Sequence, residues 1–345
     1  MKVLKFVIVL MILVIIAFSY WIYKSLNAPY THNKDSQYIQ IPQGTSPNQI
    51  IVKLNSEGII SAKIPLKIYL KITGTGNAMQ AGEYLFKSPI TPLEVLEELK
   101  SGKLRTVKLT IPEGFTRFDI AKRIDGQFPQ NNPEAGKDAL KLMEDISLIK
   151  DIAPEAKNLE GYMYPNTYNF PRAISTKAVI TKMVEEFRKA WKPEYADRAV
   201  KLKMTPHEII TIASLIETES RLNGERPIIA SVIYNRLKKG MPLGIDQTAV
   251  YIAKMENRWD GVINKSDLES NSPYNTRKIV GLPPGPISSV SESSIKAALY
   301  PATTNYIYYV LNVDKSDKSH KFYSTATDFE RGKVAYQAWL QKQRK

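Results

Sequence analysis

Eighteen consecutive uncharged residues near the N-terminus constrain this chain more than any other feature. The run Phe6–Tyr23 reads FVIVLMILVIIAFSYWIY and lies between Lys5 and Lys24. As an α-helix it would be about 27 Å long, which matches the hydrocarbon core of a bilayer. Aromatic residues gather at its far end, in SYWIY, as in an interfacial aromatic belt. The run therefore predicts one membrane-spanning helix over residues 6–23.

A cleaved signal peptide is the alternative interpretation of the same run. The tripeptide Ala17-Phe18-Ser19 loosely fits a cleavage site, but bulky Tyr and Trp follow at once without a polar region. We therefore favour an uncleaved anchor, with residues 1–5 as a cytoplasmic tail under a weak positive-inside signal. Residues 24–36 contain the polar, turn-rich stretch NAPYTHNKDS and are expected to be a linker. The rest of the chain is then expected to form a soluble body outside the cytoplasm.

The composition limits which partners and cofactors the chain can be expected to bind. The chain has 345 residues, a formal net charge of +14 and no cysteine. Its length predicts more than one domain, and the lack of cysteine excludes disulfides and thiolate metal sites. Its three histidines are far apart and form no HExxH pattern, so we expect neither a metal nor another cofactor. Lys and Arg are spread along the chain, so an anionic membrane or polymer is favoured and no nucleic-acid partner is expected.

Two segments of the chain repeat one another. IPQGTSPNQIIVKL begins at Ile41, and IPEGFTRFDIAKRI begins at Ile111. Each predicts a strand end, a glycine turn, a Ser or Thr helix cap and an amphipathic helix. A capping box at Thr91–Glu94 begins a further helix, which is expected to end near Gly102. Residues 37–105 are therefore predicted to form a small α+β module, and the pattern leaves open whether it binds a glycan, acts as a spacer or packs on the body.

Helical patterns dominate from residue 106 to residue 345, with short strands near the end. The predicted helices span 178–192, 206–223, 226–239, 291–300 and 328–343, and the predicted strands span 305–313 and 321–325. Two aromatic loops, 160–172 and 272–289, carry Tyr, Asn and Pro residues. Their rings either hold a polar, ring-shaped ligand such as a sugar or pack the loops on the core. The expected fold class is α+β.

The stretch IASLIETES, residues 212–220, places two carboxylates in an apolar helical run. These are Glu217 and Glu219, two positions apart. On a helix, two such residues point about 200° apart, so they cannot act as a side-by-side pair. This helix alone therefore does not supply the two carboxylates of an ordinary glycosidase. The helical wheel places them on opposite shoulders and hardly separates them.

The neighbours of the two glutamates favour Glu219 as a catalytic acid. On the preceding turns Glu219 is flanked by three aliphatic side chains, whereas the neighbours of Glu217 include Ser214. An aliphatic environment raises the pKa of a carboxyl group, and so does the negative end of the helix dipole. Both effects suit a general acid that must keep its proton near neutral pH. The alternative is that Glu219 is a solvated residue near a helix end.

Several motifs taken together resemble the endolytic murein transglycosylases, the membrane-anchored YceG-like family. They are IPQGTS with its following helix, EGYMYPNTYNF, IASLIETES, ERPIIASVIYNRLKKGMPL, YNTRKIVGLPPGPISS and IKAALYPATTNYIYYV, in this order. The match covers nearly the whole chain outside the linker. One departure is Gln247 in MPLGIDQTAVY, where members of the family often carry Pro. This difference could alter contacts with a glycan.

The resemblance implies a fold and an activity. It implies a LysM-like module at 37–105 and a mainly helical, lytic transglycosylase-type catalytic domain with short strands at 106–345. It also implies a lyase that cleaves the MurNAc–GlcNAc bond of nascent peptidoglycan strands and leaves 1,6-anhydro-MurNAc ends. Glu219 aligns with the catalytic acid of the family. The expected substrate-binding residues are Ser220, Gln247, Tyr274 and Asn275.

The resemblance also implies a location and partners. The chain is expected to cross the bacterial plasma (inner) membrane once, with its N-terminus cytoplasmic and its catalytic domain extracytoplasmic (periplasmic). There it would act on peptidoglycan strands, and peptidoglycan synthases are the expected protein partners. A rival hypothesis from another class is a non-catalytic, membrane-tethered scaffold that binds peptidoglycan. Only the enzyme requires a protonated Glu219 in a cleft.

Overall fold

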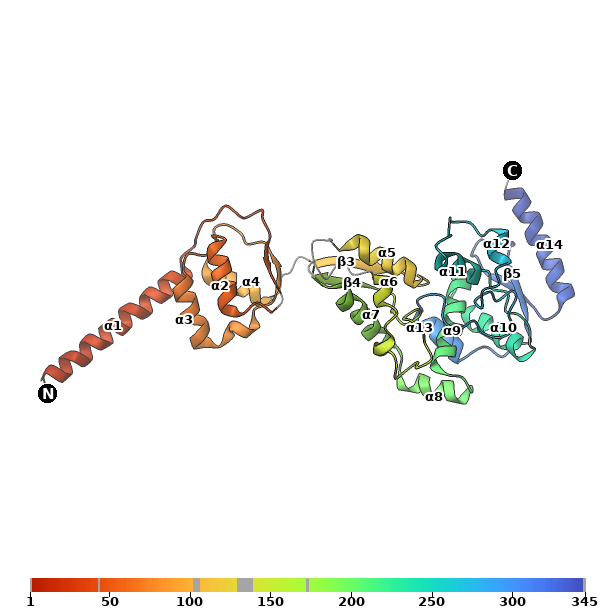
Figure 1. The fold of residues 1–345 in the computed structure, drawn as a ribbon, viewed down its shortest axis with the longest axis horizontal. Coiled ribbons are helices and arrows are strands. Elements are labelled where there is room, and N and C mark those ends of the chain that lie inside the picture. Colours follow the sequence, from red (N-terminus) through yellow and green to blue (C-terminus); the bar gives the residue numbers. More distant parts are fainter. Residues whose placement is uncertain (1, 43, 102–105, 129–138, 172–173, 344–345) are drawn as a thin grey trace. The chain divides into compact units, whose positions relative to one another are not determined.

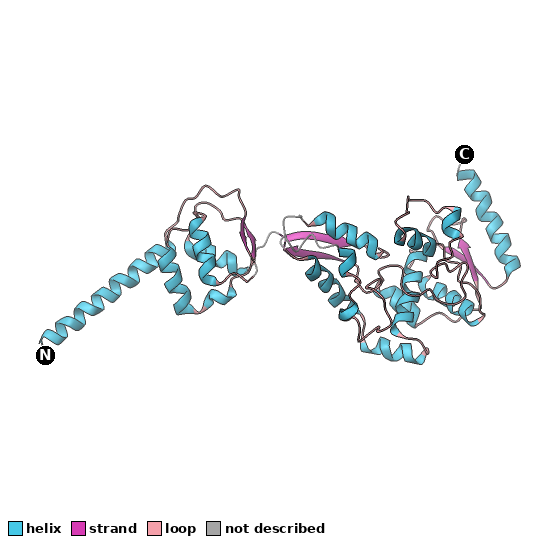
Figure 2. Cartoon of the chain, viewed as in Figure 1, coloured by secondary structure: helices cyan, strands magenta, loops and turns pink. Residues whose placement is uncertain are grey.

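The computed structural model describes residues 2–42, 44–101, 106–128, 139–171 and 174–343. The chain divides into two compact units. Unit 1 comprises Met1–Val107 with Asn169–Ile174, and unit 2 comprises Lys108–Tyr168 with Ser175–Lys345. Figure 1 labels the elements along the chain, and Figure 2 colours helices and strands.

The N-terminal helix α1 (Lys2–Asn27) contains the apolar run and continues past it. Within the described residues it is the one helix that is long and apolar enough to span a membrane. Its 26 residues correspond to about 39 Å, so it is longer than a bilayer core. Leu26, in its last turn, is only 3% exposed and belongs to the hydrophobic core of unit 1. The end of α1 is therefore part of a folded unit.

Residues 24–36 differ from the polar linker that their composition predicts. Besides the buried Leu26, the backbone of Tyr30 exchanges two hydrogen bonds with Ile90, at 2.9 and 3.0 Å. The backbone N–H of His32 donates to Ser88 Oγ at 2.9 Å. This segment is held against unit 1 because it contributes an apolar side chain to the core and backbone groups to the loop before α4.

The described residues of unit 1 form two short strands and three further α-helices besides α1. Its elements are β1 (Ile39–Ile41), α2 (Pro47–Ser56), α3 (Lys63–Thr73), the 3-10 helix η1 (Thr75–Ala78), β2 (Gly82–Tyr84) and α4 (Pro92–Ser101). The strands β1 and β2 are antiparallel, with Ile39 opposite Tyr84. The helix α3 is not among the sequence predictions. It buries Pro65, Leu66 and Leu70 and leaves Ile64 and Ile72 exposed.

The internal repeat is confirmed: both segments form the same strand–turn–helix motif. Gly44 and Gly114 have backbone φ angles of 78° and 76°, which is the left-handed region that glycine adopts most easily. Ser46 caps α2 and Thr116 caps α5, each accepting a hydrogen bond from the third helical residue in a capping box. The repeat therefore fixes where these two helices begin.

Unit 2 is mainly helical. Its helices are α5 (Arg117–Gln127), α6 (Ala139–Leu142), η2 (Ile146–Leu148), α7 (Thr176–Ala190), α8 (Pro193–Lys201), α9 (Pro206–Glu219), α10 (Arg226–Lys238), α11 (Gln247–Met255), α12 (Lys265–Leu268), α13 (Glu292–Leu299) and α14 (Ala326–Gln343). Its strands are β5 (Tyr308–Leu311) and β6 (His320–Tyr323), and the division between the two units passes through β3 (Thr106–Ile111) and β4 (Asn166–Pro171). β3 pairs with β4, and β5 with β6. The helix α9 lies at the centre and contacts α8, α10, α11 and α13.

The first aromatic loop differs from its prediction, since residues 166–171 form the strand β4. Three of its rings, Tyr162, Tyr168 and Phe170, are buried. The hydroxyl of Tyr162 lies 2.7 Å from His207 Nδ1 on α9. Of the two roles that the sequence left open, packing on the core accounts for these rings.

We expect Gly161→Ala to lower the free energy of unfolding by roughly 2–4 kcal/mol. Gly161 has a φ of 83°, and an added Cβ would lie 2.6 Å from Pro286 Cβ and 2.9 Å from Ile210 Cγ2. Left-handed backbone and overpacking each cost about 1–3 kcal/mol. Gly114→Ala is the matched control, because its φ is similar and an added Cβ there meets nothing within 4 Å. Urea unfolding of both variants measures the packing cost, and equal losses would contradict it.

Candidate active site

The helix α9 begins and ends at side chains that its own sequence supplies. Thr205 is the N-cap, with its side chain accepting from the Glu208 backbone, and Pro206 occupies the first turn. The helix ends at Glu219, because Ser220 has extended backbone angles. Ser220 Oγ then donates to the Leu222 carbonyl at 3.0 Å and accepts from the Leu222 N–H at 3.2 Å. The predicted helix to residue 223 is therefore too long, and Glu219 is the last helical residue.

Glu217 forms a buried ion pair. Its Oε1 lies 2.9 Å from Arg226 Nη2, and the two side chains are only 3% and 5% exposed. Its Oε2 accepts from the Ser291 N–H at 2.8 Å and from Ser291 Oγ at 2.5 Å. Arg226 also donates to the hydroxyls of Ser291 and Ser293. Every oxygen of Glu217 is thus used to join α9 to α10 and to the start of α13.

Glu219 has a different environment from Glu217. Its side chain is half-buried, and its Oε2 accepts a hydrogen bond of 2.6 Å from the hydroxyl of Tyr309 on β5. Burial raises the pKa of Glu219, an effect that the Tyr309 hydrogen bond and the electrostatic influence of the nearby His320 and Arg236 side chains oppose in part. The net direction is upward, towards a carboxyl group that holds its proton.

The charged groups around Glu219 are themselves held by other partners. Arg236 donates to the carbonyls of Ile307 at 2.6 Å and Leu243 at 2.5 Å, and burial lowers its pKa. His320 Nδ1 lies 2.8 Å from Glu225 Oε2. The carboxylate of Asp246, which raises the pKa of Glu219, is paired with Arg277. Glu219 itself has a hydroxyl as its partner and no ion pair within the described residues.

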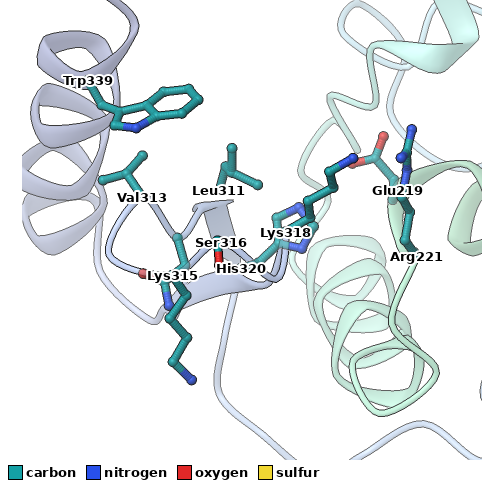
Figure 3. A pocket seen from close by; sticks show the side chains of 10 residues that line it. Glu219, Arg221, Leu311, Val313, Lys315, Ser316, Lys318, His320 and Trp339 are labelled. Atoms are coloured by element: carbon teal, nitrogen blue, oxygen red, sulfur yellow. The ribbon is translucent and has the colours of Figure 1, made fainter. Parts of the chain in front are cut away.

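Glu219 opens onto a cavity of about 560 Å³. The cavity is lined by Glu219, Arg221, Leu311, Asn312, Val313, Lys315, Ser316, Lys318, His320 and Trp339. These residues come from the end of α9, from the β5–β6 hairpin and from α14. Figure 3 shows the Lys318 side chain extending from the hairpin towards the Glu219 carboxylate, with Trp339 on the far wall. The described lining therefore combines one carboxyl group, several basic groups and one large aromatic ring.

The sequence profile of the YceG-like family matches residues 39–334, which is most of the chain. The chain belongs to the YceG-like family. A protein named endolytic murein transglycosylase from Bacillus subtilis (strain 168) is 32% identical to this YceG-like chain over 329 residues, covering 91% of this chain and 88% of the relative.

Two further relatives agree with this assignment. An endolytic murein transglycosylase of Streptococcus pneumoniae serotype 2 (strain D39) is 28% identical over 301 residues and covers 80% of this chain, but this chain spans only 54% of that longer protein. The crystal structure of a YceG-like protein from Listeria monocytogenes is 35% identical, with a TM-score of 0.57, and the match covers 85% of this chain and 98% of that one.

The substrate-binding residues expected in this YceG-like chain do not all gather at Glu219. Ser220 adjoins it, but its hydroxyl is buried and used in the turn to Leu222. Asn275 is fully buried, and its amide donates to the carbonyls of Leu268 and Ser270 at 2.9 and 2.7 Å. This geometry differs from the expected glycan contact, because both amide hydrogens hold the loop together.

Gln247 and Tyr274 lie outside the described lining of the cavity. Gln247 is the first residue of α11 and is half-buried. It follows Asp246, whose negative charge raises the pKa of Glu219. The ring of Tyr274 packs against Tyr251, with 5.0 Å between ring centroids. A role of either residue in binding glycan stays a prediction.

Sequence reasoning missed Tyr309 and Trp339 as site residues. Tyr309 lies in NYIYYVLNV, a run that predicts a strand, and alternation along that strand could have put one of its tyrosines on the face towards the acid. Trp339 lies on α14, and no local signal distinguishes it from a packing residue. Among the described residues, no group of three or more His, Cys, Asp or Glu side chains could hold a metal ion.

Proposed function

We propose that this chain is an endolytic murein transglycosylase. It cleaves the bond between MurNAc and GlcNAc within nascent peptidoglycan strands, leaves 1,6-anhydro-MurNAc ends and so limits strand length. The observation that carries the proposal is Glu219, a half-buried carboxyl group with a raised pKa that opens onto a cavity of about 560 Å³. Membership of the YceG-like family and the names of the relatives support the same reaction.

The reaction needs one group that first gives and then takes a proton. Protonated Glu219 donates to the glycosidic oxygen as the bond to MurNAc C1 breaks, and the GlcNAc-bearing strand leaves as an alcohol. The resulting Glu219 carboxylate then accepts the proton of the MurNAc C6 hydroxyl while that oxygen bonds to C1. Glu219 ends protonated, as it began, and no water is consumed.

A hydrolase would need a second carboxylate to activate water or to act as a nucleophile. Glu219 is the one carboxylate in the described lining of the cavity. The nearby carboxylates of Glu225 and Asp246 are paired with His320 and Arg277. The arrangement therefore favours attack by a hydroxyl of the substrate over attack by activated water.

The rest of the lining suits a glycan with acidic substituents. Arg221, Lys315 and Lys318 give the cavity a positive potential, which attracts the carboxylates of peptide stems. Trp339 offers a wide, rigid apolar face on which a sugar ring can lie. Peptidoglycan supplies both features.

The rival function is a membrane-tethered scaffold that binds peptidoglycan without cutting it. The decisive experiment is incubation of the full-length protein with peptidoglycan in H₂¹⁸O, followed by mass spectrometry of the muropeptides. The proposal expects anhydro ends that carry no ¹⁸O and resist reduction by borohydride. Reducing ends labelled with ¹⁸O would show a hydrolase, and unchanged strands would show the scaffold.

We expect Tyr309→Phe to move the alkaline limb of the pH–rate profile to higher pH. Activity requires protonated Glu219, so kcat/KM falls as pH rises through the pKa of Glu219 in the free enzyme. The Tyr309 hydroxyl stabilises the ionised carboxylate and lowers that pKa, so its removal lets burial raise the pKa further. Tyr308→Phe is the matched control, because Tyr308 stacks on Phe329 at 4.8 Å instead. A limb that stays in place or moves to lower pH would contradict the assignment.

The same proposal includes a location and partners. The helix α1 would cross the bacterial plasma (inner) membrane once, with the N-terminus cytoplasmic and unit 2 extracytoplasmic (periplasmic), close to peptidoglycan synthases. Its length and apolar surface support this. A LysM-like role for unit 1 would let it hold a strand before cutting.

A further inference from the structure

The helix α3 carries two rows of side chains outside the core of unit 1, and three of the six residues in them are exposed. Its sequence, KIPLKIYLKIT, has one row made of Lys63, Lys67 and Lys71 and an adjacent row made of Ile64, Ile68 and Ile72. Residues four apart on a helix lie on the same side, so each row is continuous. Ile64 is 63% exposed and Ile72 is 78% exposed, whereas Ile68 between them is half-buried.

The position of α3 beside α1 indicates what covers these rows. One hollow of about 470 Å³ is lined by Trp21, Ser25 and Ala28 of the end of α1 and the following residue, and by residues 61–65 at the start of α3. Leu26 fixes this end of α1 in the core of unit 1, so the two helices belong to one packed body. Figure 1 shows α3 beginning beside the end of α1 and turning away from its line.

The lengths place the start of α3 at the membrane surface if α1 spans the bilayer. The apolar run of residues 6–23 fills a hydrocarbon core of about 30 Å, which puts Trp21 in the interfacial layer. Ser25 lies one helical turn further, about 6 Å away. Because Ser25 and Ile64 line the same hollow, Ile64 lies at the depth of the lipid head groups.

The charges of α3 match an anionic lipid surface. The helix contains three lysines and no acidic residue, and within the described part of the chain these lysines form no ion pair. Basic groups on one row with apolar groups on the next are typical of helices that lie in the plane of a membrane interface. Phospholipid phosphates and acyl chains supply both matching partners.

We infer that α3 lies on the anionic surface of the membrane that α1 spans, with its isoleucines at the boundary between head groups and acyl chains and its lysines on phosphates. This inference rests on the proposed anchoring by α1. It adds a second membrane contact at a fixed place on unit 1. Unit 1 is then held in one orientation, with the β1–β2 pair, at the end of the unit away from α1 in Figure 2, facing away from the lipid.

The absence of native cysteine makes a direct test simple. Single cysteines at positions 64 and 72 of the full-length chain are labelled with a fluorophore, and the protein is placed, one copy per disc, in nanodiscs of phosphatidylcholine and phosphatidylglycerol. Spin-labelled lipid should quench both labels several-fold more than a label at Gln40, an exposed residue of β1. Equal quenching at positions 64, 72 and 40 overturns the inference.

A label at Leu13 in α1 reports the anchoring separately. Quenching at Leu13 without quenching at positions 64 and 72 leaves the anchor in place and overturns the contact of α3. No quenching at Leu13 overturns both. Quenching at positions 64 and 72 that requires two copies per disc assigns the surface to a second copy of the chain and also overturns the inference.

The lysines are tested by K63Q/K67Q/K71Q with a label at position 72. Quenching should fall towards the value at Gln40, and high salt should have the same effect on the parent. The matched control is K201Q/K238Q/K239Q, which removes the same charge from exposed lysines of unit 2 and should change nothing. Equal effects of the two triple variants would overturn the role of α3.

Discussion

Glu219→Gln is expected to abolish the formation of 1,6-anhydro-MurNAc ends while the protein stays folded. Gln keeps the shape of the side chain and can still accept the hydrogen bond that Tyr309 donates at 2.6 Å. It has no proton to give to the glycosidic oxygen and cannot recover one from the C6 hydroxyl. Loss of both proton transfers should lower the rate by roughly 10³-fold or more. Mass spectrometry of digested peptidoglycan measures the loss.

The stability of Glu219→Gln provides a second readout with a defined sign. Burial raises the pKa of Glu219 in the folded protein, so its contribution to stability is fully present below the unfolded pKa, about 4.3, and is lost as pH rises through the folded pKa. Gln does not titrate. The free energy of unfolding of the variant, measured in urea, should therefore increase relative to that of the parent as the pH rises from about 4 to neutral.

Glu269→Gln is the control for this pair of measurements. It makes the same chemical change at a side chain that is 62% exposed and that, within the described part of the chain, forms an ion pair with Lys265 at 3.6 Å. We expect Glu269→Gln to be as active as the parent. We also expect the difference in free energy of unfolding between this variant and the parent to stay constant with pH. If Glu219→Gln produced as many anhydro ends as the parent, Glu219 could not be the acid.

The sequence sufficed for the elements that local chemistry determines. Capping residues and glycine turns predicted the starts of α2 and α5, and Pro206 predicted the start of α9, because these signals act within one turn of the helix. The end of α9 was predicted at residue 223 instead of Glu219, because the signal that ends it is the turn between Ser220 and Leu222. The periodic pattern of apolar residues cannot predict this turn.

The candidate site could be predicted only in part, because its partners are distant in the sequence. The neighbouring residues and the helix dipole favoured Glu219 over Glu217, and the direction of the Glu219 pKa agrees. Tyr309 and Trp339 reach the site from elements that lie 90 or more residues away. Asn275 looked like a polar contact for a ligand, and only the structure reveals that its amide satisfies two loop carbonyls.

Glu217→Ala is expected to lower the free energy of unfolding by roughly 3–5 kcal/mol. The substitution leaves the guanidinium of Arg226 buried, with only the 56%-exposed Glu113 at 3.7 Å to balance its charge. It also removes the acceptor of the Ser291 N–H at 2.8 Å. Urea unfolding at neutral pH measures the loss. Glu269→Ala is the matched control, since an exposed pair contributes about 0–1 kcal/mol.

The double variant E217M/R226M separates the charge of Arg226 from the packing of α9. Removing both charges leaves no buried ion uncompensated, so the double variant should be more stable than the sum of the two single losses predicts, by about 1–3 kcal/mol. Additive losses would mean that the two residues do not stabilise each other.

Below its unfolding temperature, Glu217→Ala should keep its catalytic rate within about tenfold of the parent, because Glu217 contacts Arg226 and Ser291 and does not line the cavity. A folded Glu217→Ala protein as inactive as Glu219→Gln would reverse the roles of the two glutamates.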